Sequence, residues 1–157
     1  MLDRELRDVM ARLPAGVVVV SARFDGGYRG MTVSSLVSVS LEPPLVLVAL
    51  ESETATLAAV MATGAFNVSL LNRGQEFLAD QLAGRAPTVD PSWRTVPHHL
   101  GANGAPLIDG CVAWLECRLA DARAAGDHHV CIGEVTAATP GSGDPLVLWD
   151  RSFWTLR

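Results

Sequence analysis

The sequence predicts a mainly β protein, a β-barrel of about six to eight short strands with about two or three small helices added to it. Three observations lead to this fold class. Apolar, β-branched runs of strand length recur along the chain, glycine- and proline-rich turns separate them, and the connections are short enough for antiparallel pairing. No repeat or shift in composition marks a boundary, so we expect residues 1–157 to form a single domain.

The first third of the chain predicts one helix and two strands. Apolar residues at helical spacing predict an amphipathic helix over 2–12. The β-branched run 16–23 predicts a central strand. Asp25-Gly26-Gly27 has the chemistry of a hairpin turn, so the chain is expected to return as a second strand over about 28–40.

The middle of the chain alternates strands and helices. After a double proline, the apolar run 45–51 predicts a third strand. Ser52 is a suitable N-cap for a helix that Gly64 ends. A further strand is expected over 66–71, followed by a helix that Asn72 caps.

The last part predicts a hairpin and two closing strands. Residues 85–105 show little periodicity and suggest a long connection of the kind that forms lids or dimer arms. Residues 111–121 and 128–138 alternate around Gly126-Asp127, which predicts a hairpin with a somewhat longer loop. Two short strands are expected at the end, over 146–149 and 152–156.

Composition excludes several classes of function. The net charge of −5 and the lack of any Lys/Arg cluster argue against a nucleic-acid partner. The apolar runs are too short to span a membrane, and residues 1–13 do not resemble a signal peptide, so we expect a cytoplasmic protein with no membrane partner. The 49% hydrophobic content is high for this length and suggests contact with a second subunit, a homodimer.

The cysteines and the paired histidines do not predict a metal site. Cys111, Cys117 and Cys131 lack C-x-x-C spacing and are expected to be buried and reduced. His98 and His99 have no Cys or carboxylate beside them at ligand spacing, so we interpret them as part of a polar loop.

Hydroxyl side chains are concentrated between residues 30 and 56. Thr32, Ser34, Ser38 and Ser40 fall at even spacing, with Ser35 beside them, as on one face of a strand. The serines and threonines of 52–56 then begin a helix, whose first N–H groups can bind phosphate. This combination suits a phosphorylated, polyhydroxylated ligand, although a half-exposed strand shows the same alternation.

The second local signal is Gly126-Asp127-His128 at a strand start. Aspartate can accept a hydrogen bond from the imidazole, and the rigid strand end would project His128 into the barrel mouth. The alternative interpretation is a surface histidine after a turn. His129 is expected to point the opposite way, and we assign it no role.

These segments together resemble the short flavin reductases that supply reduced flavin to two-component monooxygenases. The resemblance covers nearly the whole chain and rests on the order and spacing of short motifs. The motifs are Pro14-Ala15-Gly16 with the following valines, Gly30-Met31-Thr32-Val33-Ser34-Ser35, Pro43-Pro44-Leu45-Val46, Phe66-Asn67-Val68-Ser69-Leu70-Leu71, Gly126-Asp127-His128 and Ile132-Gly133-Glu134-Val135. The resemblance implies the FMN-binding split β-barrel, a Greek-key type of fold.

The resemblance also implies roles for individual residues. Thr32, Ser34 and Ser35 would contact the ribityl chain and ring edge of the flavin, and His128 would meet the nicotinamide as the catalytic residue. Ser52 and Thr56 would bind the flavin phosphate, with Arg85 near it. The full set of expected cofactor-binding residues is Thr32, Val33, Ser34, Ser35, Ser38, Ser40, Ser52, Thr54, Thr56, Arg85, Asp127 and Arg151.

The function implied is hydride transfer from NADH or NADPH to FMN or FAD, with reduced flavin passed to a separate monooxygenase. Negative charge that grows on the flavin would meet backbone N–H groups, either those of 46–49 or those of Ser34 and Ser35; the pattern leaves both open. No Gly-rich dinucleotide-binding turn follows the first strand, and no arginine can be named that would bind the 2′-phosphate of NADPH. The sequence therefore does not decide between NADH and NADPH. The alternative is a non-catalytic flavin-binding protein, a store, sensor or electron-transfer module, and a barrel for an apolar ligand is a weaker third idea.

Overall fold

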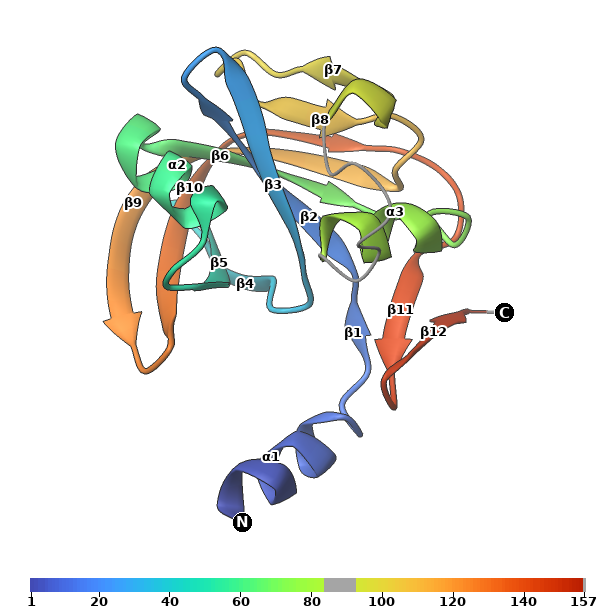
Figure 1. The fold of residues 1–157 in the computed structure, drawn as a ribbon. Coiled ribbons are helices and arrows are strands. Elements are labelled where there is room, and N and C mark those ends of the chain that lie inside the picture. The colour runs from blue at the N-terminus through green and yellow to red at the C-terminus, as the bar shows by residue number, and fades with distance from the viewer. Residues whose placement is uncertain (84–92, 157) are drawn as a thin grey trace.

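The chain folds around a seven-stranded antiparallel sheet with the strand order β3-β2-β6-β9-β10-β5-β4. The computed structural model describes residues 1–83 and 93–156. In chain order the strands of this sheet are β2 (Val18–Phe24), β3 (Gly27–Val33), β4 (Val37–Leu41), β5 (Pro44–Glu51), β6 (Ala65–Leu70), β9 (Ala113–Ala125) and β10 (His128–Pro140). Figure 1 shows the sheet curving around an interior, so the expected mainly β, antiparallel fold is confirmed.

Two small sheets, three α-helices and a 3₁₀ turn accompany this sheet in the described part of the chain. One small sheet has the order β1-β11-β12 and the other pairs β7 with β8. Their strands are β1 (Ala15–Gly16), β7 (His98–Leu100), β8 (Pro106–Ile108), β11 (Leu146–Trp149) and β12 (Ser152–Thr155). The helices are α1 (Leu2–Met10), α2 (Ala55–Thr63), α3 (Glu76–Leu82) and the 3₁₀ turn η1 (Trp93–Thr95).

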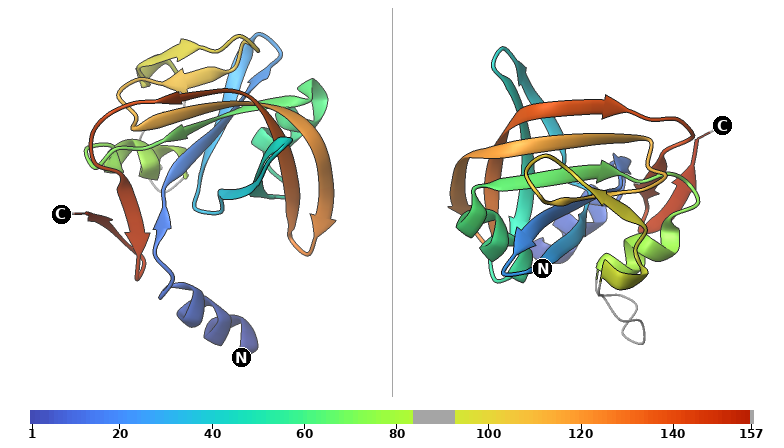
Figure 2. Two further views of the ribbon diagram at one scale, coloured as in Figure 1. Left: turned by 180° about the vertical axis from the view of Figure 1, so that it is seen from behind. Right: turned by 90° about the horizontal axis from the view of Figure 1, so that it is seen from above.

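The two edges of the large sheet are tied together by a short connection. β3 and β4 form opposite edges, yet only residues 34–36 separate them in the chain. Ser35 stitches this connection to β5: its hydroxyl donates to the carbonyl of Ala49 at 3.1 Å and accepts from the Ala49 N–H at 3.0 Å. A sheet whose edge strands are consecutive in sequence must curl, and Figure 2 shows the curled sheet from two further sides.

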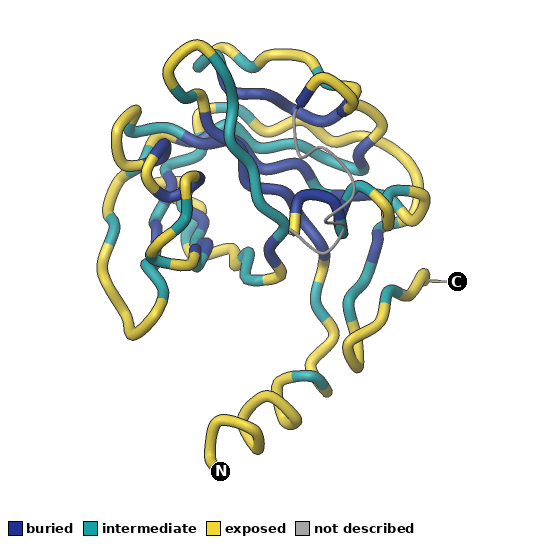
Figure 3. The backbone as a smooth tube through the Cα atoms, in the orientation of Figure 1, coloured by how far each residue is buried: buried dark blue, intermediate teal, exposed yellow. Residues whose placement is uncertain are grey.

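β2 is buried on both faces, which explains the run of four valines. Val18 and Val20 belong to the core inside the curled sheet, and Val17 and Val19 pack on the other side. Other members of the inner core are Val48, Leu50, Phe66 and Val68, and of the outer core Leu71, Ile108, Cys111 and Leu146. Figure 3 shows the buried backbone in the middle of the sheet.

β10 bends over the core at two irregular positions. Its register with β9 shifts between Ile132 and Gly133 and again between Val135 and Ala137, as β-bulges do. A Cβ on Gly133 would lie 2.5 Å from Cζ of Phe66, so glycine allows the Phe66 ring to pack against this bend.

α2 begins two to three residues later than expected. Thr54, not Ser52, is the N-cap: its backbone is extended and its hydroxyl accepts from the Leu57 N–H at 3.2 Å. Gly64 ends the helix with φ of +67°, as predicted.

α3 also begins later than the sequence pattern suggests. Asn72 does not cap it, because its side-chain oxygen accepts from the Gly74 N–H at 2.7 Å in a turn that precedes the helix. The Gln75 side chain accepts from the Asn72 N–H at 2.9 Å, and Gln75 occupies the N-cap position.

Three predictions, of a strand, of a hairpin loop and of a connection, need correction. The expected strand 28–40 is two strands, because the chain turns at residues 34–36. The hairpin of β9 and β10 has a two-residue turn, Gly126-Asp127, and not a longer loop, since both strands extend to the turn. Within the expected connection 85–105, residues 93–95 and 98–100 are ordered into η1 and β7, while 84–92 lie outside the described residues. The closing strands lie where the sequence predicts them.

α1 forms where predicted but buries none of its residues. In Figures 1 and 2 it stands apart from the sheet. Its C-terminal end is held by the turn between β11 and β12, because Trp149 Nε1 donates to the Arg12 carbonyl at 3.1 Å and the Asp150 N–H donates to the Ala11 carbonyl at 2.8 Å.

The three cysteines are buried, and His98 and His99 each have a hydrogen-bond partner. All three cysteines are free and buried, and burial raises the pKa of Cys111 and of Cys117 to about 12. His99 Nδ1 lies 2.7 Å from the Asp109 carboxylate, and His98 Nδ1 lies 2.6 Å from the Val96 carbonyl. The described residues contain no group of three or more His, Cys, Asp or Glu able to hold a metal ion, and none of their helices is long and apolar enough to cross a membrane.

Replacing Ser35 by alanine should destabilise the free protein. The change leaves both the N–H and the carbonyl of Ala49 without their side-chain partner, which costs about 1–3 kcal/mol of unfolding free energy. Urea denaturation measures this loss. Ser38→Ala, an exposed serine-to-alanine change on β4, is the matched control and should cost less than about 0.5 kcal/mol. Equal losses in the two variants would show that the Ser35 bonds do not hold the sheet closed.

Candidate active site

A cavity of about 230 Å³ opens where β3 and β5 end and β10 begins. Its lining has an apolar and a polar set of residues, called here the apolar wall and the polar edge. The apolar residues are Val17, Met31, Ala49, Leu148 and Phe153, together with Ala79 of α3 and Ala83 at its C-cap. The polar edge consists of Thr32, Ser34, Ser35, Glu51 and His128, with Val33 between the first two. The cavity thus unites the two segments that the sequence singled out, residues 32–35 and His128.

The residues of the 32–35 segment differ in how much hydrogen-bonding capacity is left for a ligand. Thr32 Oγ1 donates to the Ala79 carbonyl at 2.6 Å, which ties β3 to α3. The Ser35 hydroxyl is engaged with Ala49 on both its donor and its acceptor side. Ser34 is exposed, and neither its hydroxyl nor its N–H is bonded to another described residue. Ser34 is therefore the freest polar group of this segment.

His128 is held at the cavity mouth by its neighbour. It is the first residue of β10 and lies opposite Glu51 of β5 in the register of the sheet. Its Nδ1 lies 2.7 Å from Oδ1 of Asp127, and the hydrogen bond to His128, followed by the charge of His128, lowers the pKa of Asp127. Because Asp127 engages Nδ1, the Nε2 edge of the ring is the one available to a ligand in the cavity.

Ser38 and Ser40 do not line the cavity. The prediction placed them on one strand face with Thr32 and Ser34, but the turn at residues 34–36 moves them to β4. A register shift between Ser38 and Ser40 further breaks the alternation. The row of hydroxyls is therefore a feature of the sequence that the fold divides between two edge strands.

The hydroxyls before and within α2 have other partners. Ser52 Oγ lies 2.9 Å from Nδ1 of His129, and Thr54 Oγ1 donates to the Glu51 carbonyl at 2.9 Å while capping the helix. Thr56 is buried. None of the three is among the residues that line the cavity, so the expected phosphate site at this helix stays a prediction.

Neither of the two expected basic residues is found at the polar edge within the described part of the chain. Arg85 falls outside the described residues. Arg151 lies in the turn between β11 and β12, where its guanidinium pairs with the carboxylate of Asp8 in α1. It lines a second cavity, together with Arg7, that adjoins the first.

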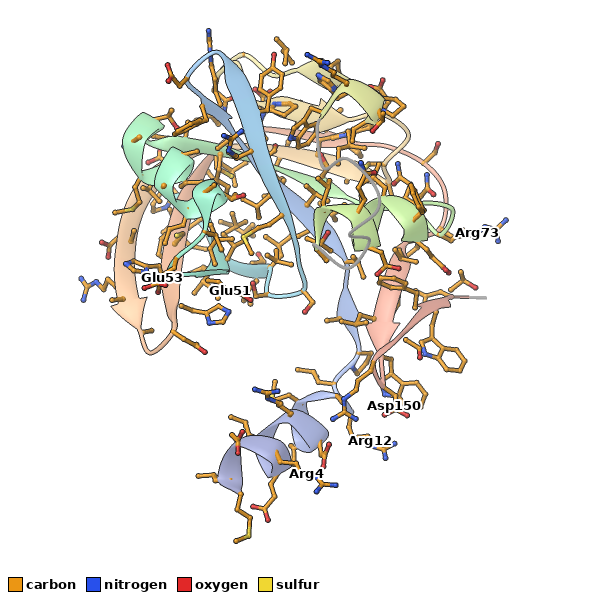
Figure 4. The ribbon with its side chains drawn as sticks, in the orientation of Figure 1. Arg4, Arg12, Glu51, Glu53, Arg73 and Asp150 are labelled. Atoms are coloured by element: carbon orange, nitrogen blue, oxygen red, sulfur yellow. The ribbon has the colours of Figure 1, made fainter. Side chains whose placement is uncertain are left out.

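The sequence pattern missed the residues that complete the cavity from other parts of the chain. Glu51 lies at the end of β5 (Figure 4), and its pairing with His128 depends on strand register. Ala79 and Ala83 are four residues apart on one side of a helix, a spacing that is visible in the sequence and allows close approach. Leu148 and Phe153 come from the hairpin of β11 and β12. No local sequence pattern predicts that they line the same cavity as the end of β3.

The comparison with known families identifies the chain. A family model described as "Flavin reductase like domain" matches residues 10–157. The chain belongs to this family.

Three relatives align with 86–97% of the chain. The reductase component of 4-hydroxyphenylacetate 3-monooxygenase from Thermus thermophilus is 36% identical over 153 residues, which cover 97% of this chain and 95% of that protein. The NADH-dependent FAD reductase of Streptomyces globisporus is 44% identical over 140 residues, covering 86% and 75%. Actinorhodin polyketide dimerase of Streptomyces coelicolor is 40% identical over 153 residues, covering 96% and 85%.

Solved structures of the family have the same fold. Flavin reductase PheA2 superposes with a TM-score of 0.92 at 31% identity, covering 100% of this chain and 99% of that one. The NADH:FAD oxidoreductase SgcE6 of Streptomyces globisporus, solved in complex with NAD and FAD fragments, has a TM-score of 0.91 at 36% identity, covering 99% and 93%.

The cavity of this flavin reductase-like chain fits a flavin ring, which is apolar on its faces and polar along one edge. The apolar wall can pack against a ring face, and the 32–35 segment offers donors along its edge. Of the two donor segments that the sequence left open, residues 46–49 are paired in the sheet between β4 and β10, and the Ala49 N–H is bonded to Ser35. The N–H groups of Ser34 and Ser35 make no hydrogen bond to other described residues and remain for a ligand.

Proposed function

We propose that this protein is a flavin reductase that oxidises NADH or NADPH and reduces FMN or FAD. The observation that carries the proposal is that the 32–35 segment and His128 line the same cavity, in a chain of the flavin reductase-like family. When bound, the flavin supplies the chemistry, since it accepts a hydride from the reduced nicotinamide. The protein needs no nucleophile or metal for such a reaction, and its task is to hold two rings together.

The residues of the cavity bind and orient the two reactants. The apolar wall of Val17, Leu148 and Phe153 excludes water from one face of the bound ring. The N–H groups of Ser34 and Ser35 stabilise negative charge on the ring edge that they meet. His128, positioned by Asp127, contacts the nicotinamide, so the two rings are brought into reacting distance within one site.

The reduced flavin leaves for a separate monooxygenase. Relatives named as reductase components of monooxygenases support this partner, and the exposed rim of the cavity at Ser34 and Glu51 supports exchange of flavin with solvent. The cytoplasmic location expected from the N-terminal sequence stays a prediction.

The active assembly in this proposal is a homodimer. The support is the apolar face of α1, where Leu2, Leu6, Val9 and Met10 are all more than half exposed in the single chain. A helix with such a face needs a partner surface to bury it, and α1 makes none of its own. A second copy of the chain provides the partner surface.

Turnover tests the proposed function against a flavin store or sensor. Purified protein with excess FMN, FAD or riboflavin should consume NADH or NADPH continuously in an absorbance assay. A store would stop after one reduction per bound flavin. A protein that shows no flavin absorbance and no turnover with any of the three flavins would contradict the proposal.

Replacing His128 by alanine should raise the KM for the nicotinamide by about tenfold, because one hydrogen bond in the site is lost. Flavin affinity, measured by fluorescence titration, should change less than twofold. His129→Ala is the matched control, because His129 is the next residue of the strand and is bonded to Ser52. Unchanged KM and turnover in His128→Ala, with flavin still bound, would remove His128 from the site.

Charged residues on the apolar face of α1 should dissociate the dimer. The double variant Leu6→Asp, Val9→Asp should shift the mass measured by light scattering from twice the 16.6 kDa of the chain to the mass of one chain. Arg4→Ala on the same helix should leave the mass unchanged. A wild-type protein that is monomeric at all concentrations would contradict the homodimer.

A further inference from the structure

Glu51 brings a carboxylate to the lining of the catalytic cavity. Of the described residues that line this cavity, only Glu51 and His128 are ionisable. No arginine is among them, and the whole chain has no lysine. Glu51 is exposed, and an exposed glutamate carries its negative charge at neutral pH. The cavity therefore has a negative charge at a wall where the described residues place no permanent cation.

The sheet fixes Glu51 beside His128. Glu51 is the last residue of β5 and lies directly opposite His128 of β10. The Ser52 N–H donates to the Asp127 carbonyl at 2.9 Å, so Ser52 and Asp127 form the hydrogen-bonded pair next to them. Glu51 and His128 are then a non-hydrogen-bonded pair, in which the two side chains leave the same face of the sheet and lie closest together. The carboxylate and the imidazole thus belong to the same part of the cavity.

The Glu51 carboxylate has no partner in the described part of the chain. It makes no hydrogen bond and no ion pair there, even with His128. The reason lies in the neighbouring turn, because Asp127 Oδ1 lies 2.7 Å from Nδ1 of His128 and engages that side of the ring. The charge of Glu51 is therefore left for a cationic group that enters the cavity.

The 32–35 segment lines the same cavity with groups of the opposite preference. The N–H groups of Ser34 and Ser35 make no hydrogen bond to other described residues and favour negative charge. Glu51 favours positive charge. The cavity thus offers one kind of group to a ring that becomes negative and the other kind to a ring that becomes positive.

The proposed reaction separates charge in this sense. A C–H bond of the reduced nicotinamide breaks, and the hydride, with both electrons, forms an N–H bond on the flavin. The nicotinamide is oxidised and its ring changes from neutral to cationic, while the flavin is reduced and gains negative charge. No proton is taken from the protein. A carboxylate at the nicotinamide therefore attracts the transition state and the oxidised product more strongly than the reduced substrate.

We propose that Glu51 contacts the bound nicotinamide ring and is the counter-charge for this ring as it becomes cationic during hydride transfer. The proposal rests on the proposed function, because it takes the nicotinamide to lie at His128. It makes Glu51 a catalytic residue that acts by charge alone. It also gives the site a preference for the oxidised nicotinamide cofactor over the reduced one, which can be measured without turnover.

The test is a pair of binding titrations by calorimetry on the full chain loaded with reduced flavin, in the absence of oxygen. Under these conditions the reduced nicotinamide cofactor has no hydride acceptor. Glu51→Gln should weaken the oxidised cofactor by about fivefold, the upper end of what a solvent-exposed ion pair contributes, and the reduced cofactor by less than about twofold. Glu51→Asp keeps the charge and should restore most of the preference.

The rate of hydride transfer provides a second measurement. In stopped-flow experiments that follow flavin absorbance, Glu51→Gln should slow flavin reduction by about twofold to threefold. This effect is smaller than the effect on binding of the oxidised cofactor, because only part of the positive charge has formed in the transition state.

Glu53→Gln is the matched control. Glu53 is exposed and lies two residues further along the chain, but it does not line the catalytic cavity; Figure 4 labels both glutamates. This variant loses the same charge and should change each affinity by less than about twofold.

Three results would overturn the role of Glu51 while the wild type still binds both cofactors and turns over flavin. They are an equal loss, or no loss, for the oxidised and reduced nicotinamide cofactors in Glu51→Gln, the same loss in Glu53→Gln, and a changed preference between oxidised and reduced flavin in place of the nicotinamide effect. A wild type that neither binds nor reduces flavin contradicts the proposed function itself.

Discussion

The site depends on the closure of the large sheet by Ser35. β3 and β4 are the edges of the seven-stranded sheet, and they form no ladder with each other among the described strands. The Ser35 hydroxyl joins the connection between these edges to the middle of β5 through both hydrogen-bonding groups of Ala49. These two hydrogen bonds place residues 32–35 beside the end of β5, where His128 pairs with Glu51.

The same closure decides which polar groups face a ligand. By bonding to Ser35, the Ala49 N–H is withdrawn from the cavity, and the N–H groups of Ser34 and Ser35 are left without partners among the described residues. The turn between β3 and β4 thus has N–H donors at the cavity. In the proposed function these N–H groups meet the polar edge of the bound ring, which links the architecture of the sheet to the chemistry of the site.

The N-terminal helix and the C-terminal hairpin extend the site in a different way. Neither belongs to the large sheet, and both are joined at Trp149 and Asp150. Their junction brings Arg7 and Arg151 to a second cavity, which adjoins the one lined by Glu51 and His128. Of these two arginines Arg151 is paired with Asp8, so the charge of Arg151 is balanced within the junction itself.

The sequence by itself determined the local elements and the two motifs of the site. Strands such as β5 and β10, the turn at Gly126-Asp127 and the C-terminus of α2 at Gly64 follow from short-range chemistry, since β-branched runs and glycines act through the local backbone. The meeting of residues 32–35 with His128 could be expected only from a family resemblance. Register and competition for hydrogen bonds are long-range effects, and only the tertiary structure decided them. In the folded chain Ser38 and Ser40 lie on β4, and Glu51, Ala79 and Phe153 line the cavity. Ser52 is bonded to His129, and Thr54 is the N-cap of α2 in its place.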